Sequence, residues 1–447
     1  MKYLLIILFS IIAISVAGNE ISVTVYNSDL GVISEKRNLN FTEGVDTLAY
    51  TNVPSRIDPA SVRFELSNSS QDVTILEQNY LFDLVSPEQM YKKYIDKEIE
   101  ILNEKGELYT GILLVASRDA ITLEDKTGEI KIVMLSKISN VTFPSLPDGL
   151  ITKPTLFWLY NSNIAGEKEC QVSYQTRGMN WEAEYVGILD AKEKNLGLSG
   201  WASISNKSGK RYENASLKLI AGDINRATQR GNGMRLEKMS TMSAAPMAGF
   251  KEKAFFEYHL YTLPRKATLA DKEIKQISLF DPASTIVSKE YLYFPDKGNN
   301  ISVNLNFKNS KVNGLGMPLP SGRVRLFKAD DDGSMILLGE DRISHTPKDE
   351  ELKLKVGNAF DVKGEYKTIS HNRISQSVIE EKYEIELRNH KDENITVRVE
   401  KKLYNDWEVL ESNFEYEKED ASTIVFQIPV AKNGESKITL KVRLNNR

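Results

Sequence analysis

The chain has 447 residues and carries 58 Lys and Arg against 62 Asp and Glu, which gives a formal net charge of −4. This near balance argues against nonspecific nucleic-acid binding and against a polybasic membrane patch. Cys170 is the single cysteine, so the chain has neither an intramolecular disulfide nor a thiolate metal cluster.

The first seventeen residues are typical of a secretory signal peptide. Lys2 precedes an apolar run over residues 3–16, and small residues stand at Ser15 and Ala17. This pattern predicts a signal peptide over residues 1–17 with cleavage after Ala17; the alternative is an uncleaved N-terminal anchor. No later apolar run approaches the roughly 20 residues of a membrane span. We therefore expect an exported protein, periplasmic or extracellular in the cell envelope, without a transmembrane span after signal cleavage.

Residues 18–85 form a strand-rich N-terminal β segment. Ile21, Val23 and Val25 alternate with Ser22, Thr24 and Tyr26. A period of two with one polar face predicts antiparallel sheets that pack on one side.

Residues 86–147 are predicted to form a small five-stranded domain. A helix start is indicated at Ser86, with Pro87 at the first helical position. Five short strand-like runs follow, at 98–102, 109–115, 120–124, 129–134 and 139–143. This number of short strands in so few residues favours a small SH3-like or Sm-like barrel.

The remaining segments are also predicted to be β-rich. Residues 150–227 form a central β region, 228–253 a flexible loop of small and polar residues, and 254–447 a C-terminal β-sandwich. The predicted fold class is therefore all-β, with several antiparallel β domains and minimal helix.

Aromatic residues in the central region are the most suggestive candidates for ligand contact. Trp181, Tyr185 and Trp201 are spaced so that they would stack on sugar rings if they faced solvent. The favoured interpretation is that Trp181 fills a sheet core, because large aromatics dominate core burial.

Catalytic and metal-binding patterns are absent from the sequence. The four histidines, at positions 259, 345, 371 and 390, show no close ligand spacing, and there is no nucleophile elbow, phosphate loop or dinucleotide fingerprint. Asp330-Asp331-Asp332-Gly333 lies between two strand-like runs, which favours a hairpin turn over a calcium loop. Cys170 lies in a strand-like run and is expected to be a core thiol. We expect no catalytic residue, cofactor or metal.

Three stretches resemble a known bacterial family. They are 174–185 (YQTRGMNWEAEY), 198–209 (LSGWASISNKSG) and 212–223 (YENASLKLIAGD), and residues 258–264 and 339–341 add to the pattern. Together they resemble the bacterial domain of unknown function 4139, over roughly residue 151 to the C-terminus. The same domain occurs in mucoidy inhibitor A-like proteins, which carry a different N-terminal domain and coiled-coil helices. The resemblance implies a secreted or periplasmic β protein and supplies no catalytic residues.

The sequence thus favours a non-catalytic binding or scaffold protein of the bacterial cell envelope, with envelope proteins or glycans as partners. One alternative is a glycosidase acting on envelope polysaccharide, because its two carboxylates would pair only in space. Another is a glycan-binding adhesin.

Overall fold

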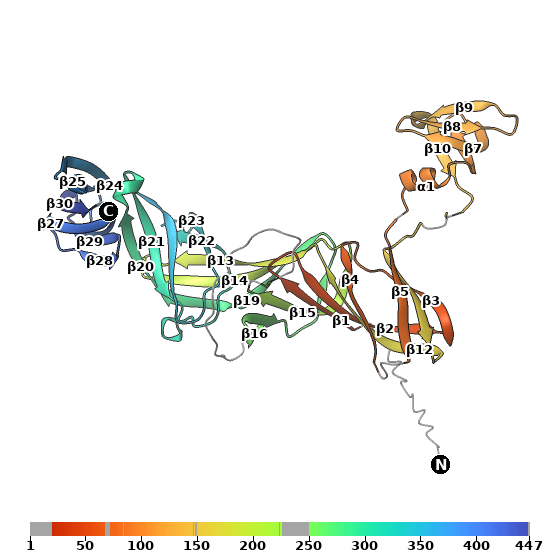
Figure 1. Cartoon of the computed structure of the whole chain (residues 1–447), viewed down its shortest axis with the longest axis horizontal. Helices are drawn as coiled ribbons and strands as arrows, with labels where there is room; N and C mark the ends of the chain where they lie inside the picture. Colours follow the sequence, from red (N-terminus) through yellow and green to blue (C-terminus); the bar gives the residue numbers. More distant parts are fainter. Residues whose placement is uncertain are drawn as a thin grey trace, which may run out of the picture. The chain divides into compact units, whose positions relative to one another are not determined.

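The structure is a computed structural model that describes residues 20–67, 72–83, 85–145, 147, 150–222, 224–225 and 250–445. The predicted signal peptide (1–17) and the predicted loop up to residue 249 lie outside the described residues. The last residues of that predicted loop, 251–253, begin strand β16 (Lys251–Phe255). The prediction of an all-β fold is confirmed, since strands β1 to β30 account for most of the described residues beside one α-helix (Figure 1).

The chain divides into two compact units that do not follow chain order. The first contains Met1–Asn180, Ser205–Lys218 and Arg265–Glu273, and the second contains Trp181–Ile204, Leu219–Pro264 and Ile274–Arg447. The predicted central region therefore contributes residues to both units, because strand pairing, and not position in the chain, decides which residues pack together.

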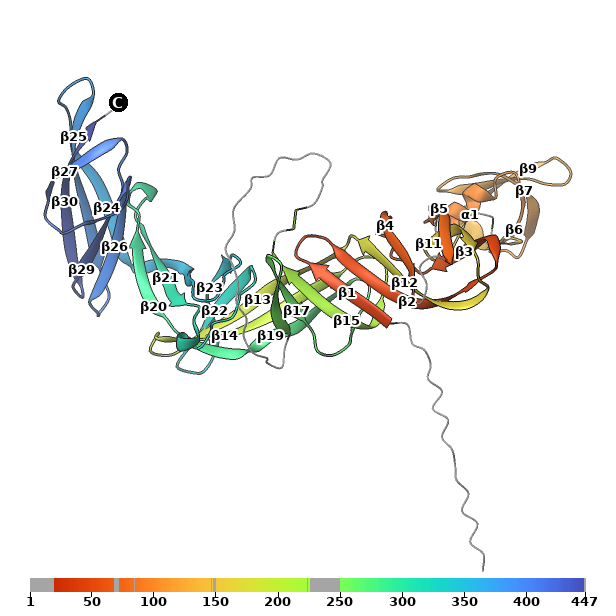
Figure 2. The ribbon, with the colours of Figure 1, turned by 60° about the horizontal axis from the view of Figure 1, so that its bottom comes forward.

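The first unit contains a large sheet and a small one. The strands of the large sheet lie side by side in Figure 2, in the order β15 (Tyr212–Ala221), β1 (Glu20–Tyr26), β2 (Gly31–Phe41), β12 (Gly166–Thr176) and β4 (Ile57–Leu66), and β18 (Ala267–Leu269) also pairs with β15. The small sheet has the order β3 (Gly44–Thr51), β11 (Thr155–Ser162) and β5 (Val73–Leu81).

Aromatic side chains fill the core of these two sheets. Phe41 of β2 meets Tyr160 of β11 edge to face, with ring centroids 5.2 Å apart. Cys170 of β12 is fully buried in the same cluster, and burial raises the pKa of its thiol to about 12. Cys170 is therefore the core thiol that the sequence predicted, and its thiol is a poor nucleophile at neutral pH.

A third sheet of the first unit follows the helix α1 (Pro87–Lys93), and we call α1 with this sheet the five-stranded module. Ser86 caps α1 as predicted, because its hydroxyl accepts a hydrogen bond of 3.2 Å from the Gln89 amide. The strand order is β10 (Ile138–Thr142), β6 (Glu98–Asn103), β7 (Leu108–Ala116), β8 (Ala120–Glu124) and β9 (Ile130–Met134), with the 3₁₀ turn η1 (Leu135–Lys137) before β10.

The five-stranded module has a core of its own. Ile99, Ile101, Leu113 and Leu123 are buried there, together with Tyr94 at the end of α1. The hydroxyl of Tyr94 donates a hydrogen bond of 2.6 Å to the carbonyl of residue 145, where the module ends.

The second unit begins with a five-stranded sheet. Its order is β19 (Glu273–Ile286), β14 (Asn195–Asn206), β13 (Met179–Leu189), β22 (Gly322–Ala329) and β23 (Met335–Ile343). β13 runs parallel to β22, which joins a strand of the predicted central region to one of the predicted sandwich. β22 and β23 form the hairpin predicted around Asp330–Gly333, and β16 forms another with β17 (Tyr258–Thr262).

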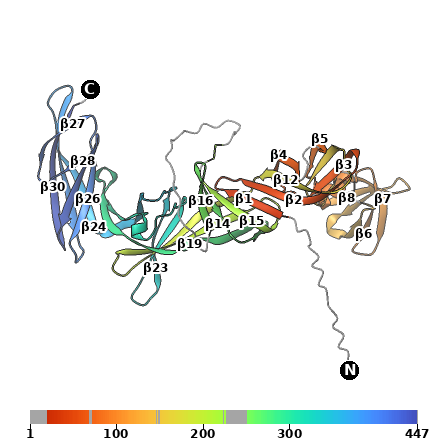
Figure 3. The ribbon, with the colours of Figure 1, turned by 90° about the horizontal axis from the view of Figure 1, so that it is seen from below.

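The strands of the nine-stranded sheet of the second unit lie together in Figure 3. Their buried side chains form one apolar core. The strand order is β27 (Asp406–Ser412), β30 (Gly434–Asn445), β25 (Val378–Asn389), β24 (Glu351–Arg373), β21 (Asn300–Lys308), β20 (Ser288–Tyr293), β26 (Ile395–Lys402), β29 (Thr423–Val430) and β28 (Glu417–Asp420), with the short turns η2 (Pro295–Lys297) and η3 (Lys311–Asn313). The 23-residue strand β24 pairs with β21 along its first part and with β25 along its second.

Candidate functional site

Two of the three aromatic candidates are buried. Trp181 is 1% exposed, and its indole N–H donates a hydrogen bond of 2.9 Å to the Ile220 carbonyl. Tyr185 is also buried, and its hydroxyl donates to the Pro320 carbonyl at 2.7 Å. Neither side chain faces solvent, so contact with a sugar ring is ruled out for both, because the strand directs them into the core of the second unit.

Trp201 of β14 is different, because its side chain is 41% exposed. Gly200 precedes it and lies against the ring of Phe280; a Cβ atom at Gly200 would lie 2.3 Å from that ring. The glycine thus lets β14 pack closely, while the next side chain, Trp201, points to the opposite face of the strand. Of the three candidates, only Trp201 presents an aromatic surface to solvent.

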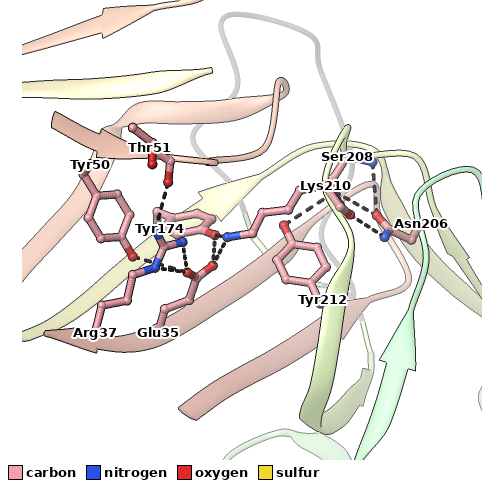
Figure 4. A network of polar contacts seen from close by, with 9 residues as sticks. All are labelled: Glu35, Arg37, Tyr50, Thr51, Tyr174, Asn206, Ser208, Lys210 and Tyr212. Atoms are coloured by element: carbon pink, nitrogen blue, oxygen red, sulfur yellow. Dashed lines mark hydrogen bonds and ion pairs between the residues drawn. The ribbon is translucent and has the colours of Figure 1, made fainter. Parts of the chain in front are cut away.

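A buried ionic cluster in the first unit was not predicted from the sequence (Figure 4). The Glu35 carboxylate of β2 accepts hydrogen bonds from Arg37, from the ammonium group of Lys210 and from the hydroxyl of Tyr174. The Tyr50 hydroxyl of β3 also donates to it, at 3.3 Å. We call these five residues the Glu35 cluster; they connect the large sheet of the first unit to the small sheet that contains β3.

The Glu35 cluster holds one carboxylate and one ammonium group out of water, with the partly buried guanidinium group of Arg37 beside them. The side chains of Glu35 and Lys210 are 1% and 3% exposed. Burial raises the pKa of Glu35, but the charges of Lys210 and Arg37 outweigh burial, so the net shift is downward. Burial, helped by the Arg37 charge, lowers the pKa of Lys210 to about 8 despite the opposing charge of Glu35. One carboxylate cannot fully compensate the buried Lys210 and the partly buried Arg37.

A lysine with a perturbed pKa is often part of a functional site. Here the ammonium group of Lys210 contacts only side chains of the core, and its small exposed fraction leaves no approach for a ligand. The Glu35 cluster is therefore a structural element, whose charged hydrogen bonds fix how β2, β3, β12 and the residues before β15 pack together.

The family motif at residues 206–209 also has a structural explanation. The side-chain amide of Asn206 donates to the carbonyls of Lys210, Leu269 and Ala270, and its oxygen accepts from Ser208. Gly209 has φ +87°, and a Cβ atom there would lie 1.9 Å from the Ser55 hydroxyl. These contacts place Lys210 beside Glu35.

A cleft in the second unit is the best candidate for a ligand site. Its volume is about 230 Å³, and it lies where β20, β21 and β24 meet residues of β13 and β23. We call it the β24 cleft. Its aliphatic lining consists of Leu189, Val303, Leu305, Leu338, Val356 and Val362, joined by Ala359 and by the rings of Tyr291 and Phe360. The side chain of Phe360 is 87% exposed.

Four charged residues also line the β24 cleft: Glu193, Lys289, Asp361 and Lys391. Glu193 accepts hydrogen bonds from Lys289 at 2.5 Å and from Lys328 at 2.7 Å. Lys391 donates to the Tyr291 hydroxyl at 3.0 Å and pairs with Glu393. Burial alone would raise the pKa of Glu193, but the two lysines lower it to about 2. The cleft therefore combines an apolar lining with charged residues, most of which are held in ion pairs.

Metal-binding geometry is not found in the part of the chain that the structure describes, where no three His, Cys, Asp or Glu residues lie close enough to hold an ion. Among the same residues, no helix is both long and apolar enough to span a bilayer.

Comparison with known proteins gives one family. No curated protein matches this chain. The family model described as a domain of unknown function, DUF4139, matches residues 170–445, which is more than half of the chain. The chain therefore belongs to the DUF4139 family.

Proposed function

We propose that this protein is an exported, non-catalytic binding protein of the bacterial cell envelope, and that it binds an apolar group in the β24 cleft. The observation that carries this proposal is the cleft itself, because an aliphatic lining with a few fixed polar groups is typical of ligand sites. Export is inferred from the signal-peptide pattern of residues 1–17.

The size of the β24 cleft indicates what kind of group fits. Small-molecule sites usually measure about 300–1,000 Å³, and this cleft measures about 230 Å³. It suits part of a larger ligand, such as one aromatic or aliphatic side chain of a partner protein or a segment of an acyl chain. Three of its four charged residues, Glu193, Lys289 and Lys391, are already held in ion pairs, so the apolar lining supplies most of the binding energy.

The pKa shifts of the carboxyl groups bear on the glycosidase alternative. A glycosidase needs one carboxylic acid with a raised pKa to protonate the leaving group. Among the described residues, every carboxyl whose pKa departs clearly from its ordinary value is shifted downward. Glu184, held by Arg323 and Arg325, is one example.

A substitution that fills the β24 cleft tests whether a ligand binds there. Ala359→Phe places a ring in the β24 cleft, and Ala329→Phe makes the same change at an exposed position of β22 outside it. The mature protein should enhance the fluorescence of an apolar dye, and Ala359→Phe should lose most of that enhancement while Ala329→Phe keeps it. Equal signals from the two variants would refute binding in this cleft.

Two further measurements address location and ligand. N-terminal sequencing of protein recovered outside the cytoplasm should begin at Gly18, and full-length protein in the membrane would contradict export. A pull-down from envelope extract should recover a ligand with the wild type and with Ala329→Phe but not with Ala359→Phe.

Glycan binding is a second candidate, favoured by the exposed ring of Trp201. A glycan array probed with the wild type and with Trp201→Ala tests it. A signal that survives the substitution would exclude Trp201 as the sugar platform.

A further inference from the structure

The outer edge of strand β9 in the five-stranded module is unusually well suited to pairing. β9 is the last strand of its sheet, and in the described part of the chain it pairs only with β8. That pairing runs without a bulge from Ala120↔Met134 to Glu124↔Ile130, and β9 contains no proline. Natural edge strands are usually blunted by prolines, bulges or charges.

The side chains of β9 that face outward are large and aliphatic. Ile130, Ile132 and Met134 are 56%, 68% and 48% exposed. Lys131 is the single charge on β9, and its ammonium group is held by Asp125 at 2.6 Å. The strand therefore lacks the free charge that would discourage another strand from pairing with it.

The free backbone groups of β9 belong to the same three residues. The amide of Asp125 donates to the Glu129 carbonyl at 3.0 Å, which marks Asp125 and Glu129 as a hydrogen-bonded pair of the β8–β9 hairpin. Hydrogen-bonded pairs alternate with non-hydrogen-bonded pairs along antiparallel strands, so Lys131 and Val133 also bond to β8. Ile130, Ile132 and Met134 then direct their N–H and C=O groups away from β8, toward the open edge.

We propose that two copies of this chain associate by antiparallel pairing of their β9 strands about a twofold axis at Ile132. In this register Ile132 faces Ile132 of the second copy, and Ile130 faces Met134 at both ends. All three outward-directed peptide groups of each strand find partners, and every outward side chain meets an aliphatic one. A register centred on Lys131 or Val133 would pair only two of the three outward-directed peptide groups within β9.

The side-chain pattern of β9 favours a second copy of the chain as the partner. Ile130 and Met134, two positions on either side of Ile132, are both long aliphatic residues, so β9 is complementary to itself about a twofold axis, as an isologous contact requires. One five-residue strand buries much less than the roughly 1,200–2,000 Å² of a stable interface. The dimer is therefore reversible and depends on concentration.

Sedimentation velocity on the full mature chain tests the dimer. The wild type should shift from monomer to dimer as its concentration rises. Ile132→Lys places two ammonium groups against each other at the axis and should weaken the dimer at least tenfold. Val312→Lys makes a comparable change at a residue that is 95% exposed in η3, and should leave the dimer unchanged. A wild type that stays monomeric, or an equal effect of both variants, would overturn the proposal.

Cross-linking tests the register. Ile132→Cys should be joined to its own copy by a short bismaleimide, because opposite residues on paired strands lie about 5.5 Å apart. Thr122→Cys stands on β8 opposite Ile132, so two further strand spacings separate the two copies and bring the distance to about 15 Å. The native thiol of Cys170 is buried and gives the background. Efficient linking at position 122, or none at 132, would overturn the proposed pairing.

Discussion

Lys210 donates a hydrogen bond to the carboxylate of Glu35, which lies 175 positions earlier in the chain. Glu35 is on β2, outside the residues that match the DUF4139 family model, whereas Lys210 lies within them. The N-terminal strands therefore supply the counter-ion for a buried lysine of the family domain.

The two ends of this ion pair should respond unequally to mutation. Glu35→Gln leaves the buried Lys210 and the partly buried Arg37 without a counter-ion and should lower the free energy of unfolding by about 3–5 kcal/mol. Lys210→Met removes the surplus cation, and Glu35 keeps Arg37 and Tyr174, so its cost should stay below about 2 kcal/mol. Urea denaturation measures both. Glu65→Gln, which breaks the exposed pair with Arg63, is the control and should change stability by less than about 1 kcal/mol. Equal losses of unfolding free energy for Glu35→Gln and Lys210→Met would contradict the role of Glu35 as the common counter-ion of Arg37 and Lys210.

The pKa of Lys210 predicts how stability varies with pH. Because the folded pKa is about 8 and the ordinary value is 10.5, the unfolded state binds more protons between these values. The contribution of this residue to stability therefore rises from pH 8 toward pH 10.5, by at most about 1.4 kcal/mol per pH unit. Urea denaturation at pH 7, 8, 9 and 9.5 should show a steeper rise for the wild type than for Lys210→Met. Parallel curves for the two proteins would show that Lys210 keeps an ordinary pKa.

A fragment limited to residues 170–445 should lose the order of its first strands. It begins inside β12, and both neighbours of that strand, β2 and β4, are missing from it. Amide hydrogen exchange along β12 should be much faster in the fragment than in the mature chain, while β25 and β30 of the second unit should keep their protection. Full protection of β12 in the fragment would show that the family domain folds without the N-terminal strands.

The five-stranded module should fold alone. Residues 86–147 contain α1, five strands and a separate buried core. The isolated segment should give a cooperative thermal transition by circular dichroism. A random-coil spectrum would show that the module depends on the rest of the chain.

Replacing Trp181 should destabilise the protein more than replacing Trp201, because Trp181 is buried and Trp201 is partly exposed. Trp181→Ala opens a cavity in the second unit and should cost about 3–5 kcal/mol. Trp201→Ala changes a partly exposed residue and should cost less than about 1 kcal/mol. Thermal melting of both variants beside the wild type measures this difference. A melting temperature of Trp181→Ala within about a degree of the wild type would contradict its place in the core.

The sequence alone was sufficient for the fold class and for local features. A linear pattern can predict features that depend on neighbouring residues. Examples are the alternation of apolar and polar residues in 21–26, the helix cap at Ser86 and the Asp-Gly turn before Ser334. The stretches around Trp181 and Asn206 were also sufficient to indicate the family.

Only the tertiary structure decided which distant residues meet. Nothing near Glu35 or Lys210 in the sequence indicates their contact, because strand order across a sheet is set by packing of whole strands and not by local spacing. The β24 cleft likewise combines Leu189, Tyr291 and Phe360 from three strands of two sheets. Trp181 and Trp201 are both tryptophans in β strands, so the sequence does not show which of them is buried. Only the position of each strand face relative to a core determines which one meets solvent.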